Sequence, residues 1–181
     1  MKYWYENKHL LKKEREGYEK FMRGKFPDTK IRQRIDNENR LVFLVEFSFR
    51  ISTEALKTLV KKSKLSNEAK EEAYRKIDVY GTPPKRHFSF MMRYEHMLSD
   101  SDSSGDFGGE IRAYVMTKID KTFHHLITDY KNGLKYVCQA SRIRDEDANS
   151  KKLMEHMLRF CEMYVLWEIT GVDIDRLGGF A

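Results

Sequence analysis

The sequence predicts an α+β fold: a single domain spanning residues 1–181, with a mainly antiparallel sheet of five or six strands and a long C-terminal helix packed on it. Three observations lead to this prediction. Apolar residues recur at helical spacing over residues 150–169, several β-branched or aromatic runs upstream have the character of strands, and no linker is long enough to separate two domains. The expected element order is α–β–β–α–α–β–β–β–β–α.

The first three helices are predicted from their caps and their ends. Phe26 ends the first helix, because the residue before a proline disfavours helical backbone. Ser52 offers a hydroxyl cap to the second helix, and Ser66 or Asn67 offers a cap to the third. The predicted helices cover about residues 6–22, 53–64, 67–77 and 150–169.

The strands are predicted from alternation and aromatic content. The first strand turns Ile31 and Ile35 inward if Lys30, Arg32 and Arg34 face out. The second strand is apolar on both faces near its start, which favours a central position in the sheet. The predicted strands cover about residues 30–35, 40–51, 86–97, 110–119, 122–131 and 134–143.

Asn132-Gly133 predicts a hairpin between the last two strands. This dipeptide supplies the two positive-φ positions of a type I′ turn, whose twist matches that of paired strands. A two-residue loop pairs Ile127 with Cys138 and Asp129 with Tyr136. It also places Ile127 and Tyr136 together on the face that we expect to point to the core.

The last helix has an apolar surface wider than a solvent-facing helix needs. Leu153, Met157, Phe160, Tyr164 and Trp167 form one stripe, and a second apolar stripe lies beside it. The helix is therefore expected to lie across the sheet, or between the sheet and a partner. Together with the aromatic N-terminus, this width also favours self-association as a symmetric homodimer.

Composition excludes several classes of protein. Of the 181 residues, 40% are hydrophobic and 34% are charged, which is typical of a globular domain. No run approaches the ~20 apolar residues of a membrane span, and the N-terminus is too charged for a secretory signal. Cys138 and Cys161 both occupy expected core positions, so we expect buried thiols and a cytoplasmic location.

The net charge of +6 is concentrated near the N-terminus. Residues 1–35 contain eleven Lys and Arg residues against five acids, whereas residues 98–181 contain eleven against fourteen. This asymmetry favours a basic end that meets an anionic partner. The alternative interpretation is a lysine-rich helix face that is only solvated.

Basic residues interleaved with aromatic residues predict a nucleic-acid interface. Single-stranded nucleic acid is held by cations along its backbone and by rings stacked on its bases. Residues 85–94 combine both residue types, although the same mixture also forms ordinary half-buried strands. The candidate nucleic-acid-binding residues are Lys8, Lys12, Lys13, Arg15, Lys20, Arg23, Lys85, Arg86 and Arg93.

The sequence contains no motif for a cofactor, a phosphate loop or a catalytic triad. Asp100, Asp102 and Asp106 superficially resemble a calcium loop, but Ile111 occupies the twelfth position, where a calcium hand needs Glu. A solvated loop is therefore favoured over a metal site at these aspartates. We expect no cofactor and no resident metal. The sequence does not decide whether the protein is an enzyme, and a non-enzymatic protein is favoured.

Three functional hypotheses follow from these features. The first is a non-enzymatic binding protein whose basic N-terminal half engages nucleic acid or a nucleoprotein complex. The second is a protein-interaction factor, such as an inhibitor or regulator from a phage or mobile element, that acts on a protein partner. The third is a small metal-dependent phosphodiesterase that uses the acidic loop and a histidine.

Overall fold

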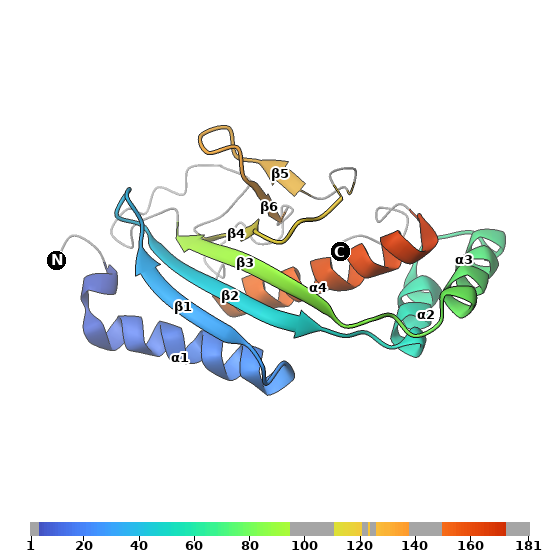
Figure 1. Cartoon of the computed structure of the whole chain (residues 1–181), viewed down its shortest axis with the longest axis horizontal. Coiled ribbons are helices and arrows are strands. Elements are labelled where there is room, and N and C mark those ends of the chain that lie inside the picture. The colour runs from blue at the N-terminus through green and yellow to red at the C-terminus, as the bar shows by residue number, and fades with distance from the viewer. Residues whose placement is uncertain (1–3, 95–110, 121–122, 124–125, 138–149, 173–181) are drawn as a thin grey trace.

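The computed structural model confirms the predicted α+β fold. It describes residues 4–94, 111–120, 123, 126–137 and 150–172 (Figure 1). The helices are η1 (Trp4–Glu6), α1 (Lys8–Lys25), α2 (Thr53–Lys62), α3 (Asn67–Tyr80) and α4 (Ser150–Thr170). The strands are β1 (Lys30–Ile35), β2 (Leu41–Phe49), β3 (Arg86–Tyr94), β4 (Ile111–Val115), β5 (Leu126–Thr128) and β6 (Lys135–Val137).

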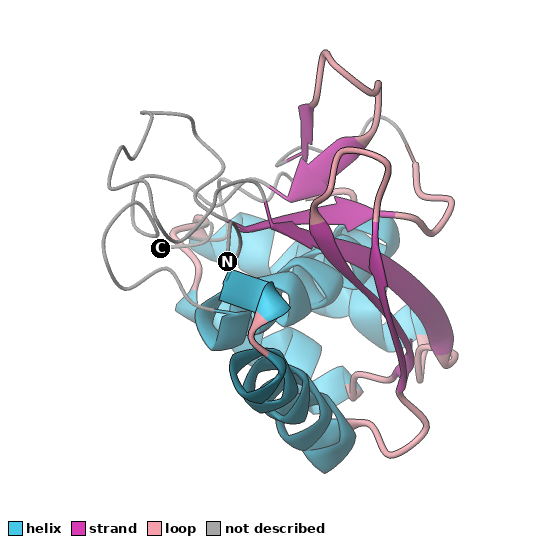
Figure 2. Ribbon diagram, turned by 90° about the vertical axis from the view of Figure 1, so that its left-hand side faces the viewer, coloured by secondary structure: helices cyan, strands magenta, loops and turns pink. Residues whose placement is uncertain are grey.

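The six strands form one antiparallel sheet in the order β1-β2-β3-β4-β6-β5. The helices lie on one side of this sheet, as Figure 2 shows. Phe43 and Phe90 point to the helical side, where both are fully buried. Among the described residues, no helix covers the opposite side, which faces the viewer in Figure 1. This uncovered side is called the open face below.

Helix α4 forms the centre of the core, and the prediction for residues 150–169 is confirmed. Phe160 is fully buried, with its ring centroid 6.2 Å from that of Phe90 on β3 and 5.3 Å from that of Phe123. Tyr164 is also buried and stacks on Phe160 at 6.3 Å. Most residues of the two apolar stripes are buried, because α4 packs against the sheet and against other helices of the same chain.

Most features that suggested a homodimer are accounted for within one chain, and Tyr3, which was also part of that argument, lies outside the described residues. The second stripe of α4 packs inside the domain, and Tyr5 is buried. Trp4 packs against Tyr94, with ring centroids 5.7 Å apart. The homodimer stays a prediction, but α4, Trp4 and Tyr5 no longer give a reason to expect it.

The helix ends follow the capping chemistry expected from the sequence. Ser52 accepts a hydrogen bond from the Ala55 N–H, and Ser66 accepts one from the Ala69 N–H. Helix α1 begins later than predicted, because the side chain of Asn7 caps it by accepting from the N–H groups of residues 9 and 10. It continues to Lys25, and extended backbone at Phe26 then leads into Pro27.

The predicted two-residue turn at Asn132-Gly133 is wrong. Only Gly133 has positive φ, at 70°, whereas a type I′ turn needs two such positions. Instead, the Gly133 N–H donates to the Asp129 carbonyl at 2.7 Å, and the Asp129 N–H donates to the Leu134 carbonyl at 2.8 Å. These bonds close a four-residue loop over residues 130–133. Ile127 therefore pairs with Tyr136, two positions away from the predicted register.

Two of the predicted inward-facing positions are also corrected. Ile127 and Tyr136 lie on the open face in a small apolar cluster, and Val137 beside them points to the main core. Ile35 is 47% exposed because it ends the edge strand β1, although Ile31 is buried as predicted. Cys161 is buried and carries a free thiol, as predicted, and Cys138 lies outside the described residues.

Candidate nucleic-acid interface

Helix α1 carries a row of exposed cations along one side. The row consists of Lys8, Lys12, Arg15 and Arg23. Its successive members are four, three and eight residues apart, which places them on one side of the helix. Glu19 lies within this row and pairs with Arg15 at 3.3 Å and with Arg23 at 4.0 Å. All four cationic residues are exposed.

This row faces the edge of the sheet at β1. On one flank of α1, Glu14 accepts a hydrogen bond from the Tyr94 hydroxyl of β3, toward the middle of the sheet. On the other flank, the Arg23 Nε donates to the Thr29 carbonyl, the residue directly before β1, at 3.5 Å. Tyr18 lies between the two flanks and stacks on Phe43 at 4.5 Å. The cationic row therefore runs alongside β1, as the placement of the two elements in Figure 1 also indicates.

Strand β1 adds a second row of cations on the open face. Lys30, Arg32 and Arg34 pair in register with open-face residues of β2, so their side chains point away from the helices. All three are exposed, and none of the described strands pairs with the outer side of β1. The two rows together are called the basic edge: Lys8, Lys12, Arg15, Arg23, Lys30, Arg32 and Arg34.

The charge of the basic edge is only partly balanced. Lys12 pairs with Glu16 at 3.7 Å and Arg32 with Glu46 at 3.3 Å, but exposed pairs of this kind contribute little and exchange readily. Residues 8–35 contain ten Lys and Arg residues against four acids. Residues 53–80, which include α2 and α3, contain seven against five. The excess of positive charge is therefore larger at the basic edge.

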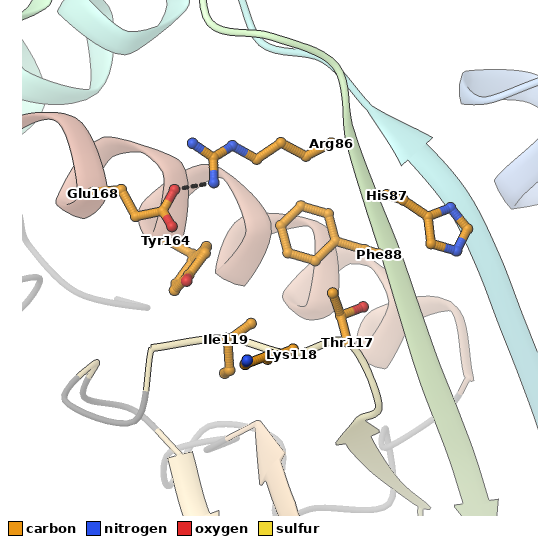
Figure 3. Close-up of a pocket in the computed structure, with 8 residues that line it drawn as sticks. All are labelled: Arg86, His87, Phe88, Thr117, Lys118, Ile119, Tyr164 and Glu168. Carbon is orange, nitrogen blue, oxygen red and sulfur yellow. Dashed lines mark ion pairs between the residues drawn. The ribbon is translucent and has the colours of Figure 1, made fainter.

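The other predicted residues are distributed around this edge. Lys13 and Lys20 are exposed farther around α1, and Lys85 lies 3.8 Å from Asp28, close to the start of β1. Arg86 instead points toward α4 and forms an ion pair with Glu168 (Figure 3). The pocket beside this pair has a volume of about 250 Å³, which is below the usual range for a ligand site. Arg86 is therefore left out of the proposed interface.

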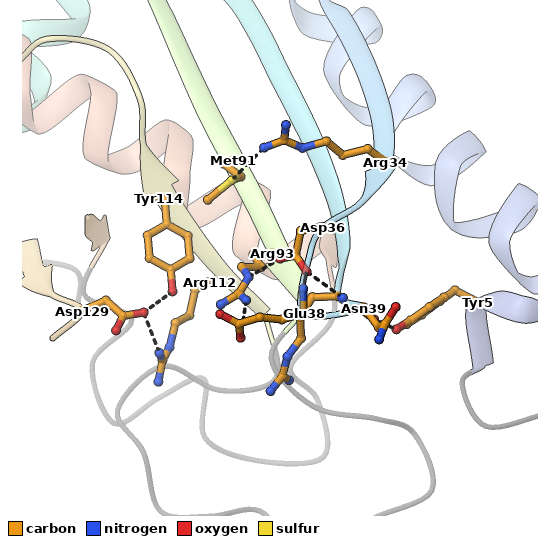
Figure 4. A network of polar contacts seen from close by, with 11 residues as sticks. Tyr5, Arg34, Asp36, Glu38, Asn39, Met91, Arg93, Arg112, Tyr114 and Asp129 are labelled. Atoms are coloured by element: carbon orange, nitrogen blue, oxygen red, sulfur yellow. Dashed lines mark hydrogen bonds and ion pairs between the residues drawn. The ribbon is translucent and has the colours of Figure 1, made fainter. Parts of the chain in front are cut away.

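Arg93 lies in the same cross-strand row as Arg34, but its charge is already paired. It is only 8% exposed and pairs with Asp36 at 2.7 Å and with Glu38 at 2.9 Å (Figure 4). Its charge is matched by these two carboxylates, which follow β1 in the chain. The structure therefore places Arg93 on the open face, in a network that ties β3 to the turn after β1, where its charge is already matched.

The Asp36 carboxylate contributes to stability in a pH-dependent way. Burial raises the pKa of Asp36, but hydrogen bonds from the Arg40 N–H and the Arg93 guanidinium outweigh burial and lower the pKa below its ordinary value. A lowered native pKa stabilises the fold above the ordinary value, and this contribution is lost as the pH falls through the native value. We expect Asp36→Asn to flatten the decline of the unfolding free energy below about pH 5. Denaturant titrations at several pH values measure this; an unchanged slope would contradict it.

The cations Lys30, Arg32 and Arg34 were recognised as outward-facing residues of a strand, but the sequence alone did not assign them to the interface. Their role depends on β1 being an edge strand beside α1. Edge position follows from the order in which strands pair, which is a property of the whole sheet. Charged residues on a short strand were the one signal that pointed to it.

The remaining expectations concern metals and membranes. The acidic loop with Asp100, Asp102 and Asp106 lies outside the described residues. Within the residues that the structure does describe, no group of three or more His, Cys, Asp or Glu side chains could hold a metal ion. None of the described helices combines the length and the apolar character needed to cross a bilayer.

Comparisons with protein-family models, with curated proteins and with solved structures find no match for this chain. Its function is therefore inferred from its own charges, contacts and exposed side chains.

Proposed function

We propose that this protein binds nucleic acid through the basic edge, by contacts to phosphates, without carrying out chemistry on it. The observation that carries the proposal is the presence of two exposed cationic rows near one edge of the sheet. One lies on α1 and the other on the open face of the edge strand β1, and the contact of Arg23 with Thr29 joins the two elements at one end. Neighbouring phosphates of a nucleic-acid strand present a line of negative charge, and each cation that neutralises a phosphate releases a condensed counterion. Contacts to phosphates carry no sequence information, so the proposed binding is independent of sequence.

The main competing explanation is protection of the sheet edge. Charged side chains on an edge strand prevent its free backbone groups from pairing with another chain. This function accounts for cations on β1, such as Arg32 and Arg34. It does not account for the second row on α1, where the helix has no free edge to protect. Binding to a polyanion accounts for both rows.

The proposal is tested by binding labelled oligonucleotides of mixed sequence to the purified protein. Fluorescence anisotropy at about 50 mM salt should show saturable binding, with log K falling linearly as log salt rises. The slope should be close to −0.9 for each phosphate contact on a duplex and −0.7 on a single strand. Absence of binding at low salt would overturn the proposal and would favour a protein partner for the same surface.

A further inference from the structure

The loop between β5 and β6 presents one aromatic ring almost entirely to solvent. Tyr130 is 98% exposed, and Lys131 beside it is also exposed. A side chain in this position buries no apolar area and contributes nothing to the core. The fold therefore gives no reason for an aromatic residue at the tip of this loop.

The loop that carries Tyr130 is held in place by hydrogen bonds to the side chain of Asp129. This residue is only 6% exposed, and its carboxylate accepts hydrogen bonds from the Lys131 N–H at 2.9 Å and from the Tyr114 hydroxyl at 2.6 Å. Arg112 approaches the same carboxylate at 3.5 Å (Figure 4). The backbone that carries the ring is therefore held in place, so binding immobilises little of the loop beyond the Tyr130 side chain itself.

The charges around the ring favour an anionic partner. The one acid in the loop region, Asp129, is buried against Arg112, whereas Lys131, the residue after the ring, is exposed. An aromatic ring next to an exposed cation is the combination that holds single-stranded nucleic acid, because the ring stacks on a base while the cation neutralises a phosphate.

The loop and the basic edge lie at opposite sides of the sheet. The strand order places β1 at one edge and β5 at the other, and Figure 1 shows the loop on the far side of the sheet from α1. Five strand spacings separate the edges, roughly 24 Å. The open face lies between them, and no described helix covers it. An extended strand of nucleic acid that lies across the open face would therefore contact both the basic edge and the loop that carries Tyr130.

We infer that Tyr130 is a base-stacking residue, and that the ligand of the basic edge is single-stranded nucleic acid whose path crosses the open face. This inference rests on the proposed function, because a stacked ring alone does not hold a polyanion. It adds a preference for single strands over duplex. Bases inside a duplex are already stacked on their neighbours, so they offer no free face to Tyr130.

The test compares Tyr130→Ala and Tyr130→Phe on a single-stranded 20-mer and on the matching duplex. Tyr130→Ala should weaken single-strand binding by roughly 5- to 150-fold, as expected for one stacked base, and Tyr130→Phe should retain the affinity. Duplex binding should be unchanged by either substitution. The slope of log K against log salt should also be unchanged, because the substitution removes no charge.

An independent readout uses Tyr130→Trp, whose indole fluorescence should be quenched when the single strand is added, beyond any change seen in the unmutated protein. Equal loss on both ligands, or no loss on the single strand, would overturn the stacking role of Tyr130. Either result would leave the proposed function intact if substitutions in the basic edge still abolish binding. Failure of the unmutated protein to bind any nucleic acid would instead overturn the proposed function itself.

Discussion

Reversing three charges of the basic edge, with Lys8→Glu, Lys12→Glu and Arg34→Glu together, is expected to reduce nucleic-acid affinity more than about a hundredfold at 0.1 M salt. One neutralised phosphate is worth a factor of roughly eight at this salt concentration, and the factors for three phosphates multiply. All three residues are exposed, so the fold should be retained. Circular dichroism shows whether the fold is retained, and fluorescence anisotropy measures the nucleic-acid affinity of the same sample.

A matched control reverses the same number of charges elsewhere. Lys61, Lys62 and Lys64 are exposed at and just beyond the end of α2, away from the basic edge, and their replacement by Glu changes the net charge equally. We expect this control to lose little affinity beyond a general effect of net charge. If the control loses as much as the edge variant, binding follows overall charge and the basic edge is not a distinct site.

Truncation of Phe160 to Ala is expected to lower the unfolding free energy by about 3–5 kcal/mol. The ring is fully buried and lies within 6.3 Å, between centroids, of Phe90, Phe123 and Tyr164. Its removal weakens the packing between the sheet and α4. It also leaves a cavity that the surrounding side chains fill only partly. Such a decrease is a large fraction of the roughly 5–15 kcal/mol typical of a domain.

Denaturant unfolding measures this change, with Val79→Ala as the control. Val79 is 78% exposed on α3, so its truncation should alter stability by no more than about 0.5 kcal/mol. A decrease below about 1 kcal/mol for Phe160→Ala would show that α4 does not form the centre of the core. The comparison separates the effect of burial from the general effect of removing an apolar side chain.

The fold was predictable where local pattern and tertiary packing agree. The double stripe of α4 and the apolar run at the start of β2 both predict burial, and Phe160 and Phe43 are fully buried. The hairpin was mispredicted because Asn132-Gly133 strongly favours a two-residue turn. The competing hydrogen bonds come from Asp129, whose burial against Arg112 depends on a strand that is distant in the sequence. No local signal in the chain indicates that contact.

The candidate site was predictable in part for a similar reason. The excess of positive charge in α1 is a property of composition, and the exposed positions of Lys12 and Arg15 follow from helical spacing. Arg93 was assigned to the interface because its neighbours are aromatic and basic. Its acidic partner Asp36 lies 57 residues away in the chain, so the ion pair that occupies Arg93 is a tertiary property.

The salt dependence of duplex binding tests the central claim most directly, because its slope counts the phosphates that the protein neutralises. The unmutated protein, the edge variant and the control variant are titrated on one duplex from low to high salt. The proposed interface predicts that the slope of the edge variant is shallower by about 0.9 for each phosphate it no longer neutralises, and that the control slope equals that of the unmutated protein. An edge variant that binds with the same slope as the unmutated protein would contradict the assignment of the interface to α1 and β1.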